Sequence, residues 1–329
     1  MTILITGAAG FIGFHVAERL LARGETVLGL DSVNDYYSVK LKQDRLAGLM
    51  ERPGFAFRKV DLADFEALKA VIAEAGPVRG IVHLAAQAGV RYSLTNPHAY
   101  LHANLTGHLN MLEVARHMDG LDHMVYASSS SVYGGNTKLP FSVDDRVDQP
   151  VSLYAATKKS DELMSHCYAH LFRVPQTGLR FFTVYGPWGR PDMAMWLFTE
   201  AILAGKPIRV FNHGNMRRDF TYIDDIVTGV VASLDNPPAD GGPGKPPQRV
   251  YNIGNHRSES LMRMIALIEQ ALGREAEKIM EPMQPGDVAE TYADIEAIRN
   301  DLGFEPTTPI DVGIPRFVDW YRAYHGVEY

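Results

Sequence analysis

The stretch Gly7-Ala-Ala-Gly10-Phe-Ile-Gly13 decides the fold of this 329-residue chain. It follows an apolar run at residues 2–5, which is short enough for a buried strand, and it precedes a helical pattern that ends near Gly24. Glycines at a strand-to-helix turn let the backbone approach a pyrophosphate, whose negative charge the helix N-terminus favours. The GxxGxxG spacing therefore predicts a dinucleotide-binding turn.

An acidic residue follows the second expected strand, residues 25–30. Asp31 lies 18 residues after Gly13, near the distance at which a ribose-binding carboxylate is expected. Such a carboxylate accepts from the ribose 2′-OH and repels a 2′-phosphate, so the sequence favours NAD over NADP. The alternative is a glycine-rich turn followed by a strand-end aspartate, as in many other α/β proteins.

The composition is that of an ordinary globular protein, with 46% hydrophobic and 22% charged residues. The net charge of −7 argues against nucleic acid as the main partner. Cys167 is the only cysteine, which excludes an internal disulfide and cysteine-rich metal sites, so no metal is expected. Its neighbours Leu163, Met164 and Leu171 predict that Cys167 lies in the core face of a helix.

No apolar run approaches the ~20 residues that a membrane helix needs. Met1 leads directly into the first expected strand, which leaves no room for a signal peptide. We therefore expect a cytoplasmic protein that does not engage a membrane.

Strand-like runs alternate with helix-length segments through the first half of the chain, and the later strand-like runs are residues 55–60, 80–84, 124–128 and 178–182. This rhythm predicts an α/β fold with a parallel sheet and helices on both faces. Beyond about residue 185 the rhythm breaks, so we expect a smaller C-terminal region that caps the sheet.

The segment Tyr154-Ala-Ala-Thr-Lys158 places a phenol and an ammonium one helical turn apart. A tyrosine is a poor base at neutral pH because its ordinary pKa lies near ~10. A neighbouring ammonium and a positive nicotinamide ring both favour the phenolate, which makes this tyrosine a candidate general base. The run Ser128-Ser-Ser-Ser131 follows a strand, at whose carboxyl end ligands bind. Either motif also occurs by chance.

These motifs together resemble the extended short-chain dehydrogenase/reductase superfamily. Within it, four longer runs are similar to the UDP-glucuronate 4-epimerase family: AGVRYSLTNP from Ala88, YASSSSVYG from Tyr126, RFFTVYGPWGRPDM from Arg180 and RRDFTYIDD from Arg217. The resemblance covers essentially the whole chain. It implies a Rossmann-type doubly wound parallel sheet, with residues 1–182 as the NAD-binding domain. Residues 183–329 would mainly bind a UDP-sugar, with some segments returning to the Rossmann domain.

The resemblance also implies roles for individual residues. The catalytic residues would be Ser129, four positions before the tyrosine of VYG, with Tyr154 and Lys158. The residues expected at the cofactor are Gly7, Gly10, Phe11, Ile12, Gly13, Asp31, Asp61, Leu62, Leu84, Ala85, Ala86, Gln87, Asn104, Ser128, Tyr154, Lys158 and Phe181. The residues expected at the substrate are Arg91, Ser130, Ser131, Thr183, Arg190, Arg218 and Asp287.

Among the substrate residues, Arg190 is the expected partner of the sugar carboxylate, since arginine suits a carboxylate. Hydroxyl donors beside it would be Thr183, Ser130 and Ser131, and Arg91 is the next candidate. The resemblance places Arg218 at the pyrophosphate and Asp287 at the uridine ribose. One residue of the pair Arg217 and Arg218 is expected to be solvated only.

The resemblance also bears on the reaction. Related dehydratases and UDP-glucuronate decarboxylases carry an acidic residue two positions before the tyrosine of VYG, where this chain has Ser131. The expected reaction is therefore reversible 4-epimerisation of UDP-glucuronate to UDP-galacturonate, through a 4-keto intermediate and tightly bound NAD. One alternative is a 4-epimerase of UDP-N-acetylhexosamine or UDP-glucose. Another is a catalytically silent NAD-binding regulator, which would not require Ser129, Tyr154 and Lys158.

Two helical segments, residues 100–117 and 153–172, are rich in leucine. Related enzymes pair such helices across a two-fold axis as a four-helix bundle. The resemblance therefore implies a homodimer.

Overall fold

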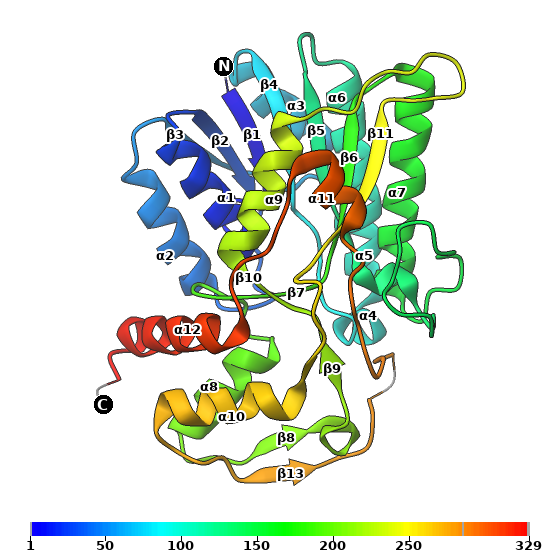
Figure 1. Cartoon of the computed structure of the whole chain (residues 1–329). Helices are drawn as coiled ribbons and strands as arrows, with labels where there is room; N and C mark the ends of the chain where they lie inside the picture. The colour runs from blue at the N-terminus through cyan, green and yellow to red at the C-terminus, as the bar shows by residue number, and fades with distance from the viewer. Residues whose placement is uncertain (1, 285, 328–329) are drawn as a thin grey trace.

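A seven-stranded parallel sheet forms the centre of the larger part of the molecule (Figure 1). The computed structural model describes residues 2–284 and 286–327. The strand order is β11-β6-β5-β4-β1-β2-β3. The strands are β1 (Thr2–Thr6), β2 (Thr26–Asp31), β3 (Phe55–Lys59), β4 (Val78–His83), β5 (His123–Ser129), β6 (Gln176–Phe181) and β11 (Gln248–Ile253).

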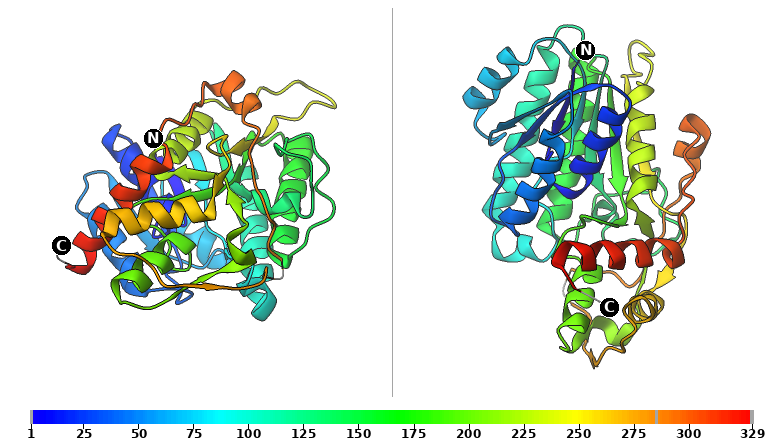
Figure 2. Two further views of the ribbon diagram at one scale, coloured as in Figure 1. Left: turned by 60° about the horizontal axis from the view of Figure 1, so that its bottom comes forward. Right: turned by 90° about the vertical axis from the view of Figure 1, so that its left-hand side faces the viewer.

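Helices cover both faces of this sheet, as Figure 2 shows. One face carries α1 (Phe11–Ala22), α2 (Val39–Met50) and α9 (Ile223–Asp235), and the other carries α3 (Phe65–Glu74), α6 (Gly107–Arg116) and α7 (Leu153–Phe172). Successive side chains of β1 point to opposite faces. Ile3 and Ile5 therefore join the core beneath α1, while Leu4 joins the core beneath α3 and α6. The predicted doubly wound Rossmann-type fold is confirmed.

The order of the strands reverses between β1 and β4, which lie side by side with Thr6 opposite His83. The chain winds from β1 toward β3 in one direction and from β4 toward β6 in the other. The loops that follow β1 and β4 consequently diverge, and a crevice opens at the carboxyl ends of the strands. This is the position of the predicted glycine turn.

A smaller C-terminal lobe lies beyond the carboxyl ends of the sheet (Figures 1 and 2). Its described residues form three two-stranded sheets and three α-helices. The strand pairs are β7 (Thr183–Tyr185) with β10 (Phe220–Tyr222), β8 (Ile208–Val210) with β13 (Lys278–Met280), and β9 (Arg217–Arg218) with β12 (Glu259–Ser260). The helices are α8 (Ala194–Leu203), α10 (Leu261–Leu272) and α12 (Ile310–His325).

Several segments after residue 182 lie against the Rossmann sheet. β11 pairs in register with β6, α9 packs on α1, and α11 (Glu296–Leu302) packs near β11. The phenol of Tyr251 on β11 donates to Asp301 on α11 at 2.7 Å. The chain therefore leaves the sheet after β6 and returns to it.

Short helical turns connect the main elements near the crevice. They are α4 (Tyr92–Thr95), α5 (Pro97–Tyr100), the π-helical η1 (Leu101–Thr106), and the 3-10 helices η2 (Ser130–Tyr133) and η3 (Phe211–Gly214).

The prediction that Cys167 belongs to the core is wrong, because the thiol is on the exposed face of α7. Leu163 and Leu171 are exposed on the same helix. The buried face of α7 is mainly polar and carries Lys158 and Asp161. Apolar residues therefore do not mark the inward face of this helix.

In the described ranges 2–284 and 286–327, no helix has the length and apolar character needed to cross a membrane.

Candidate active site

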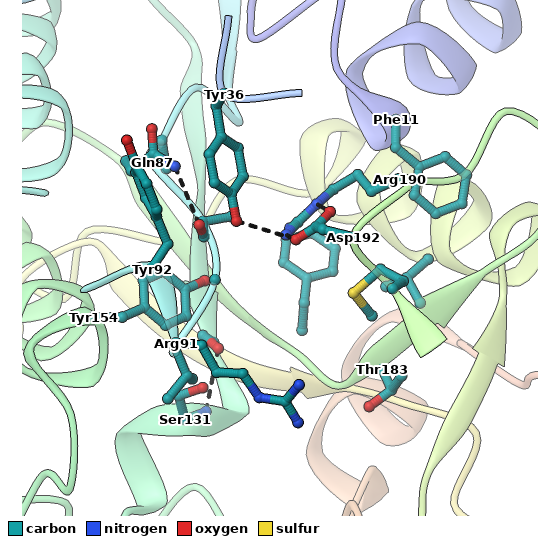
Figure 3. Close-up of a pocket in the computed structure, with 18 of the residues that line it drawn as sticks. Phe11, Tyr36, Gln87, Arg91, Tyr92, Ser131, Tyr154, Thr183, Arg190 and Asp192 are labelled. Atoms are coloured by element: carbon teal, nitrogen blue, oxygen red, sulfur yellow. Dashed lines mark hydrogen bonds and ion pairs between the residues drawn. The ribbon is translucent and has the colours of Figure 1, made fainter. Parts of the chain in front are cut away.

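A cavity of about 1130 Å³ lies between the carboxyl ends of the parallel strands and the C-terminal lobe. Its volume exceeds the ~300–1,000 Å³ of a typical small-ligand pocket, so it has room for two ligands side by side. The predicted cofactor and substrate residues line this one cavity, with the exception of Asn104. Figure 3 shows several of them, with Tyr154 and Ser131 on one side and Arg190 and Thr183 on the other.

The glycine turn packs too closely for side chains. A Cβ atom on Gly13 would lie 2.1 Å from the Gly7 carbonyl oxygen, and one on Gly10 would lie 2.9 Å from it. Gly7 has a φ of +74°, which suits glycine. Helix α1 follows with Gly10 as its N-cap and no side-chain cap. Backbone N–H groups at the start of α1 are thus available to a pyrophosphate.

Asp31 ends β2 and supports the glycine turn from below. Its carboxylate accepts from the N–H of Val33 at 2.7 Å and from the N–H of Ala9 at 3.1 Å. Burial raises the pKa of Asp31. Lys42 on α2 lines the cavity nearby and donates to the backbone and side-chain oxygens of Asn34, both at 2.7 Å. An acid with a cation beside it forms the ribose end of the predicted cofactor site.

Tyr154 and Lys158 lie in the first turns of α7 and both line the cavity. The hydroxyl of Ser152 caps the helix by accepting from the N–H of Ala155 at 3.1 Å. The ammonium of Lys158 is almost fully buried and donates to the Ala127 carbonyl at 2.8 Å. The helix cap and this backbone contact fix the tyrosine–lysine pair against the end of β5.

Ser129 is the last residue of β5 and lines the same cavity. Its hydroxyl accepts from the N–H of Ser131 at 3.2 Å and caps η2, which carries Ser130 and Ser131. The neighbouring Ser128 is committed elsewhere, because its hydroxyl donates to Glu162 at 2.6 Å. Ser129 is therefore the serine of this run that best fits the predicted catalytic role.

Asn104 lies behind the cavity wall. Its amide oxygen accepts from the N–H of Gln87 at 2.8 Å, and its amide nitrogen donates to the Gln87 carbonyl at 3.1 Å and to Thr157 at 3.0 Å. Asn104 thus fixes the loop after β4 to α7. The structure gives it a supporting position where the sequence predicted a cofactor contact.

The other predicted cofactor residues come from strand ends. Asp61 and Leu62 follow β3, residues 84–87 follow β4, and Phe181 ends β6. Asp61 also accepts from His102 at 2.8 Å. Loops from neighbouring parallel strands therefore build one wall of the cavity.

Arg190 lines the cavity but already holds a carboxylate of this chain. Its Nε donates to Asp192 at 3.0 Å and its Nη2 at 2.5 Å, and Tyr36 donates to the same aspartate at 3.1 Å (Figure 3). Burial acts to raise the pKa of Asp192, but the Arg190 guanidinium outweighs burial and holds that pKa below its ordinary range. Burial and Asp192 raise the pKa of Tyr36 to about 12. Asp192 thus occupies the edge of the guanidinium formed by Nε and Nη2, and Nη1 has no hydrogen-bond acceptor among the residues that the structure describes.

Two more arginines meet at the far end of the cavity. Arg91 donates to Asp287 at 3.1 Å, and its guanidinium lies 4.8 Å from the centre of the Phe211 ring. Arg218 donates to two carbonyls, those of Arg217 at 2.8 Å and Ala289 at 3.2 Å. Burial lowers the pKa of Arg218, and Arg91 adds to this effect while Asp287 opposes it. The excess of positive charge suits an anionic ligand.

The structure also separates the two neighbouring arginines. Arg218 lines the cavity, whereas Arg217 lies outside its lining and donates to Ser258 at 3.1 Å and Glu290 at 3.2 Å. Thr183 begins β7 and lines the cavity. The placement of Arg218 and Thr183 fits their predicted roles.

The sequence did not indicate which side chain supports the turn that precedes Arg190. Arg45 on α2 is fully buried and donates to the carbonyls of Ala9 at 2.9 Å, Trp188 at 2.6 Å and Gly189 at 3.1 Å. It therefore connects the glycine turn with the turn that precedes Arg190. The spacing of charges in residues 39–50 was the available signal, but such a pattern is equally typical of a solvated helix.

A Rossmann sheet with a glycine turn, a strand-end acid and a tyrosine–lysine pair in one cavity defines a dinucleotide-binding enzyme of the short-chain dehydrogenase/reductase class. The arginines in the lining of the same cavity suit an anionic second ligand. The chain belongs to the NAD dependent epimerase/dehydratase family, whose sequence profile matches residues 3–254.

The chain is similar over its whole length to proteins that include the following three. Protein CapI of Staphylococcus aureus is 52% identical over 335 residues, which cover 99% of each protein. The probable UDP-glucuronate 4-epimerase of Rhizobium meliloti (strain 1021) is 49% identical over 332 residues, which cover 98% of this chain and 97% of that protein. The crystal structure of UDP-glucuronic acid 4-epimerase from Bacillus cereus, in complex with UDP-glucuronic acid and NAD, is 34% identical. It covers 98% of this chain and 100% of its own, with a TM-score of 0.88.

Proposed function

We propose that the chain catalyses the reversible 4-epimerisation of UDP-glucuronate to UDP-galacturonate with tightly bound NAD. The observation that carries this proposal is the single cavity whose lining includes the glycine turn, the Tyr154–Lys158 pair and the arginines Arg91, Arg190 and Arg218. The full-length similarity to UDP-glucuronate 4-epimerases supports the choice of substrate.

The residues at the glycine turn fit NAD. The uncapped N-terminus of α1 and the close-packed Gly7, Gly10 and Gly13 would hold the pyrophosphate, and Asp31 would accept from the ribose. Bound there, NAD would supply reversible hydride transfer at C4 of the sugar. These contacts belong mainly to residues 1–182, which we propose as the NAD-binding domain, with residues 183–329 mainly holding the UDP-sugar.

Tyr154 is the proposed base. Its phenolate takes the proton of the C4 hydroxyl while that carbon is oxidised, and the Lys158 ammonium one turn away favours the phenolate. The Ser129 hydroxyl would hydrogen-bond to the same sugar oxygen. After the keto sugar has rotated to present its opposite face to the cofactor site, Tyr154 returns the proton to the C4 oxygen.

The side chains beside the sugar favour epimerisation over elimination. Ser131 occupies the position where related dehydratases and decarboxylases carry an acid, so the 4-keto sugar meets no carboxyl group from this position. We propose that Arg190 holds the sugar carboxylate through its Nη1 group, with Thr183, Ser130 and Ser131 as hydroxyl donors. Charge-assisted hydrogen bonds of this type are roughly twice as strong as neutral ones.

The far end of the cavity would hold the UDP portion. Arg218 is the proposed pyrophosphate contact and Asp287 the proposed ribose contact, with Arg91 beside them. Arg91 and Asp287 pair with each other at 3.1 Å, so the nucleotide would meet an existing ion pair here.

The purified protein is expected to epimerise UDP-glucuronate without added NAD, because the hydride returns to the sugar in each turnover. Product formation by chromatography, with absorbance monitoring of NADH, checks this expectation. Net NADH in proportion to product would indicate a dehydrogenase instead.

The same assay with UDP-glucose and UDP-N-acetylglucosamine separates the alternatives. Turnover of these sugars without turnover of UDP-glucuronate would favour the neutral-sugar epimerase. No turnover of any sugar by protein that contains NAD would favour the silent regulator.

We further propose a homodimer that forms through α6 and α7. These helices pack side by side, and their outer faces expose Leu109, Leu163 and Leu171 at 40%, 57% and 65%. Adjacent exposed leucines are typical of a protein interface, and a second copy of the chain fits a self-complementary apolar face. A cytoplasmic location stays a prediction.

Leu163→Arg is expected to convert the dimer to a monomer, since it places a charge in the centre of the apolar face. Light scattering at micromolar concentration measures the mass. Met50→Arg on α2 is the matched control, because Met50 is exposed to a similar extent, 59%, on a different helix. A native protein with the mass of one chain would contradict the proposed dimer.

A further inference from the structure

A buried carboxylate lies directly behind the tyrosine–lysine pair. Asp161 follows Lys158 by one turn of α7, and its side chain is 1% exposed. Its Oδ2 accepts from the Lys158 ammonium at 3.1 Å. Its Oδ1 has no hydrogen-bond partner among the residues that the structure describes. Lys158 therefore has a counter-ion that is poorly solvated.

The other titratable groups around Asp161 leave it as the counter-ion of Lys158. Glu162 is bound to Arg180 at 2.8 and 3.0 Å, which compensates its charge. His83 on β4 and His108 on α6 are buried, and burial lowers the pKa of each imidazole, so both are neutral. Burial raises the pKa of Tyr126 on β5, so its phenol is neutral as well.

The ionisation of Asp161 itself falls in the working range of many enzymes. Burial raises the pKa of Asp161 to about 6, with Lys158 opposing the shift. Above that pH the Asp161 carboxylate is negatively charged and attracts the Lys158 ammonium. The positive charge of Lys158 is expected to favour the Tyr154 phenolate, and the negative charge of Asp161 opposes that effect.

We propose that Asp161 sets the pH range of proton transfer at Tyr154 by partly neutralising the Lys158 ammonium. The inference rests on the roles proposed above for Tyr154 and Lys158. With a neutral residue at position 161, the ammonium acts on the phenol unopposed, so the phenolate forms at lower pH. The rising limb of the pH profile, which follows formation of the Tyr154 phenolate, then moves to lower pH.

The test is Asp161→Asn, which preserves shape and removes the charge. The tyrosinate absorbance of the NAD-bound protein is titrated with pH, and the same titration of protein that also carries Tyr154→Phe is subtracted. The expected midpoint for Tyr154 is about one pH unit lower than in the native protein, since an adjacent charge shifts an ionisation by ~1–3 units. The rising limb of kcat against pH should move by a similar amount.

An unchanged or higher midpoint in Asp161→Asn overturns the proposal, as does a loss of kcat without movement of the profile, which is what a packing role predicts. Asp161→Ser provides a second neutral variant in case the amide misfolds. Asp119→Asn, in the exposed loop before β5, is the control and should move neither readout. Because the absorbance titration needs no turnover, it remains informative even if UDP-glucuronate is not the substrate.

Discussion

Tyr154→Phe is expected to lower kcat by roughly 100- to 10,000-fold, the range that general acid–base catalysis contributes. The substitution removes only the phenolic oxygen, at a half-buried position in the first turn of α7. The helix cap at Ser152 and the buried Lys158 contact to Ala127 remain. The fold and the bound NAD should therefore be retained, as circular dichroism and cofactor analysis of the denatured protein would measure.

Tyr168→Phe is the matched control for this experiment. Tyr168 lies on the same helix, its phenol donates to Glu113, and it is outside the cavity lining. Its loss should leave kcat close to the native value. If Tyr154→Phe keeps more than about a tenth of native kcat, Tyr154 is not the base.

Arg190→His is expected to divert the reaction toward loss of carbon dioxide. Oxidation of C4 in a uronate makes a β-keto acid, which decarboxylates when the bond from C5 to the carboxylate stands perpendicular to the new carbonyl. Carbon dioxide leaves, and C5 takes a proton, so the product is a 4-keto-pentose. A firmly held carboxylate cannot adopt that alignment, and its departure as neutral carbon dioxide would forfeit the charge-assisted contacts.

Histidine at position 190 weakens the hold without emptying the site. A hydrogen bond to a charged group contributes ~1.5–3 kcal/mol, so epimerisation should fall by about 10- to 100-fold. Mass spectrometry of the sugar nucleotides measures the 4-keto-pentose. Absorbance measures the NADH that remains on the enzyme, since the hydride is not returned when the carboxyl is lost.

Arg146→His is the control, because Arg146 pairs with Asp148 two residues later, just as Arg190 pairs with Asp192, but on an exposed loop. Near-native epimerisation by Arg190→His, with no decarboxylated product, would show that Arg190 does not hold the carboxylate. Arg91 would then be the next candidate.

The sequence predicts most of the elements whose signals are local. The glycine turn and the parallel strands each depend on a few neighbouring residues. The sequence also predicts that Tyr154 and Lys158 lie together, because i and i+4 positions share a helix face. Such features depend on the local segment and not on the fold around it.

The parts that the sequence could not predict depend on contacts between distant segments. The pairing of Tyr36 with Asp192 spans 156 residues, and Arg45 reaches the turn before Arg190 across a similar separation. Asn104 faces Gln87 through the wall of the cavity because α5 and η1 carry it there. Local sequence patterns give no information on contacts between residues that are so far apart in the sequence.

The hydrophobic pattern of α7 predicts the wrong inward face, and the reason is physical. Its buried positions include Lys158, Asp161 and Glu162, since this helix carries the proposed chemistry. The leucines that would normally mark a core instead face outward. A helix that serves both a reactive centre and an apolar outer surface inverts the usual distribution of residues.

The return of the chain to the sheet limits how such proteins can be recombined. The edge strand β11 and the covering helix α9 both come after residue 182, and Arg23, the residue that follows α1, donates to Asp235 at the end of α9. A fragment that stops after β6 would leave β6 paired on one side only, with β5, and would leave α1 without α9, which packs on it. Exchange of sugar specificity between relatives therefore requires several crossovers, or grafting of the individual loops that reach the cavity.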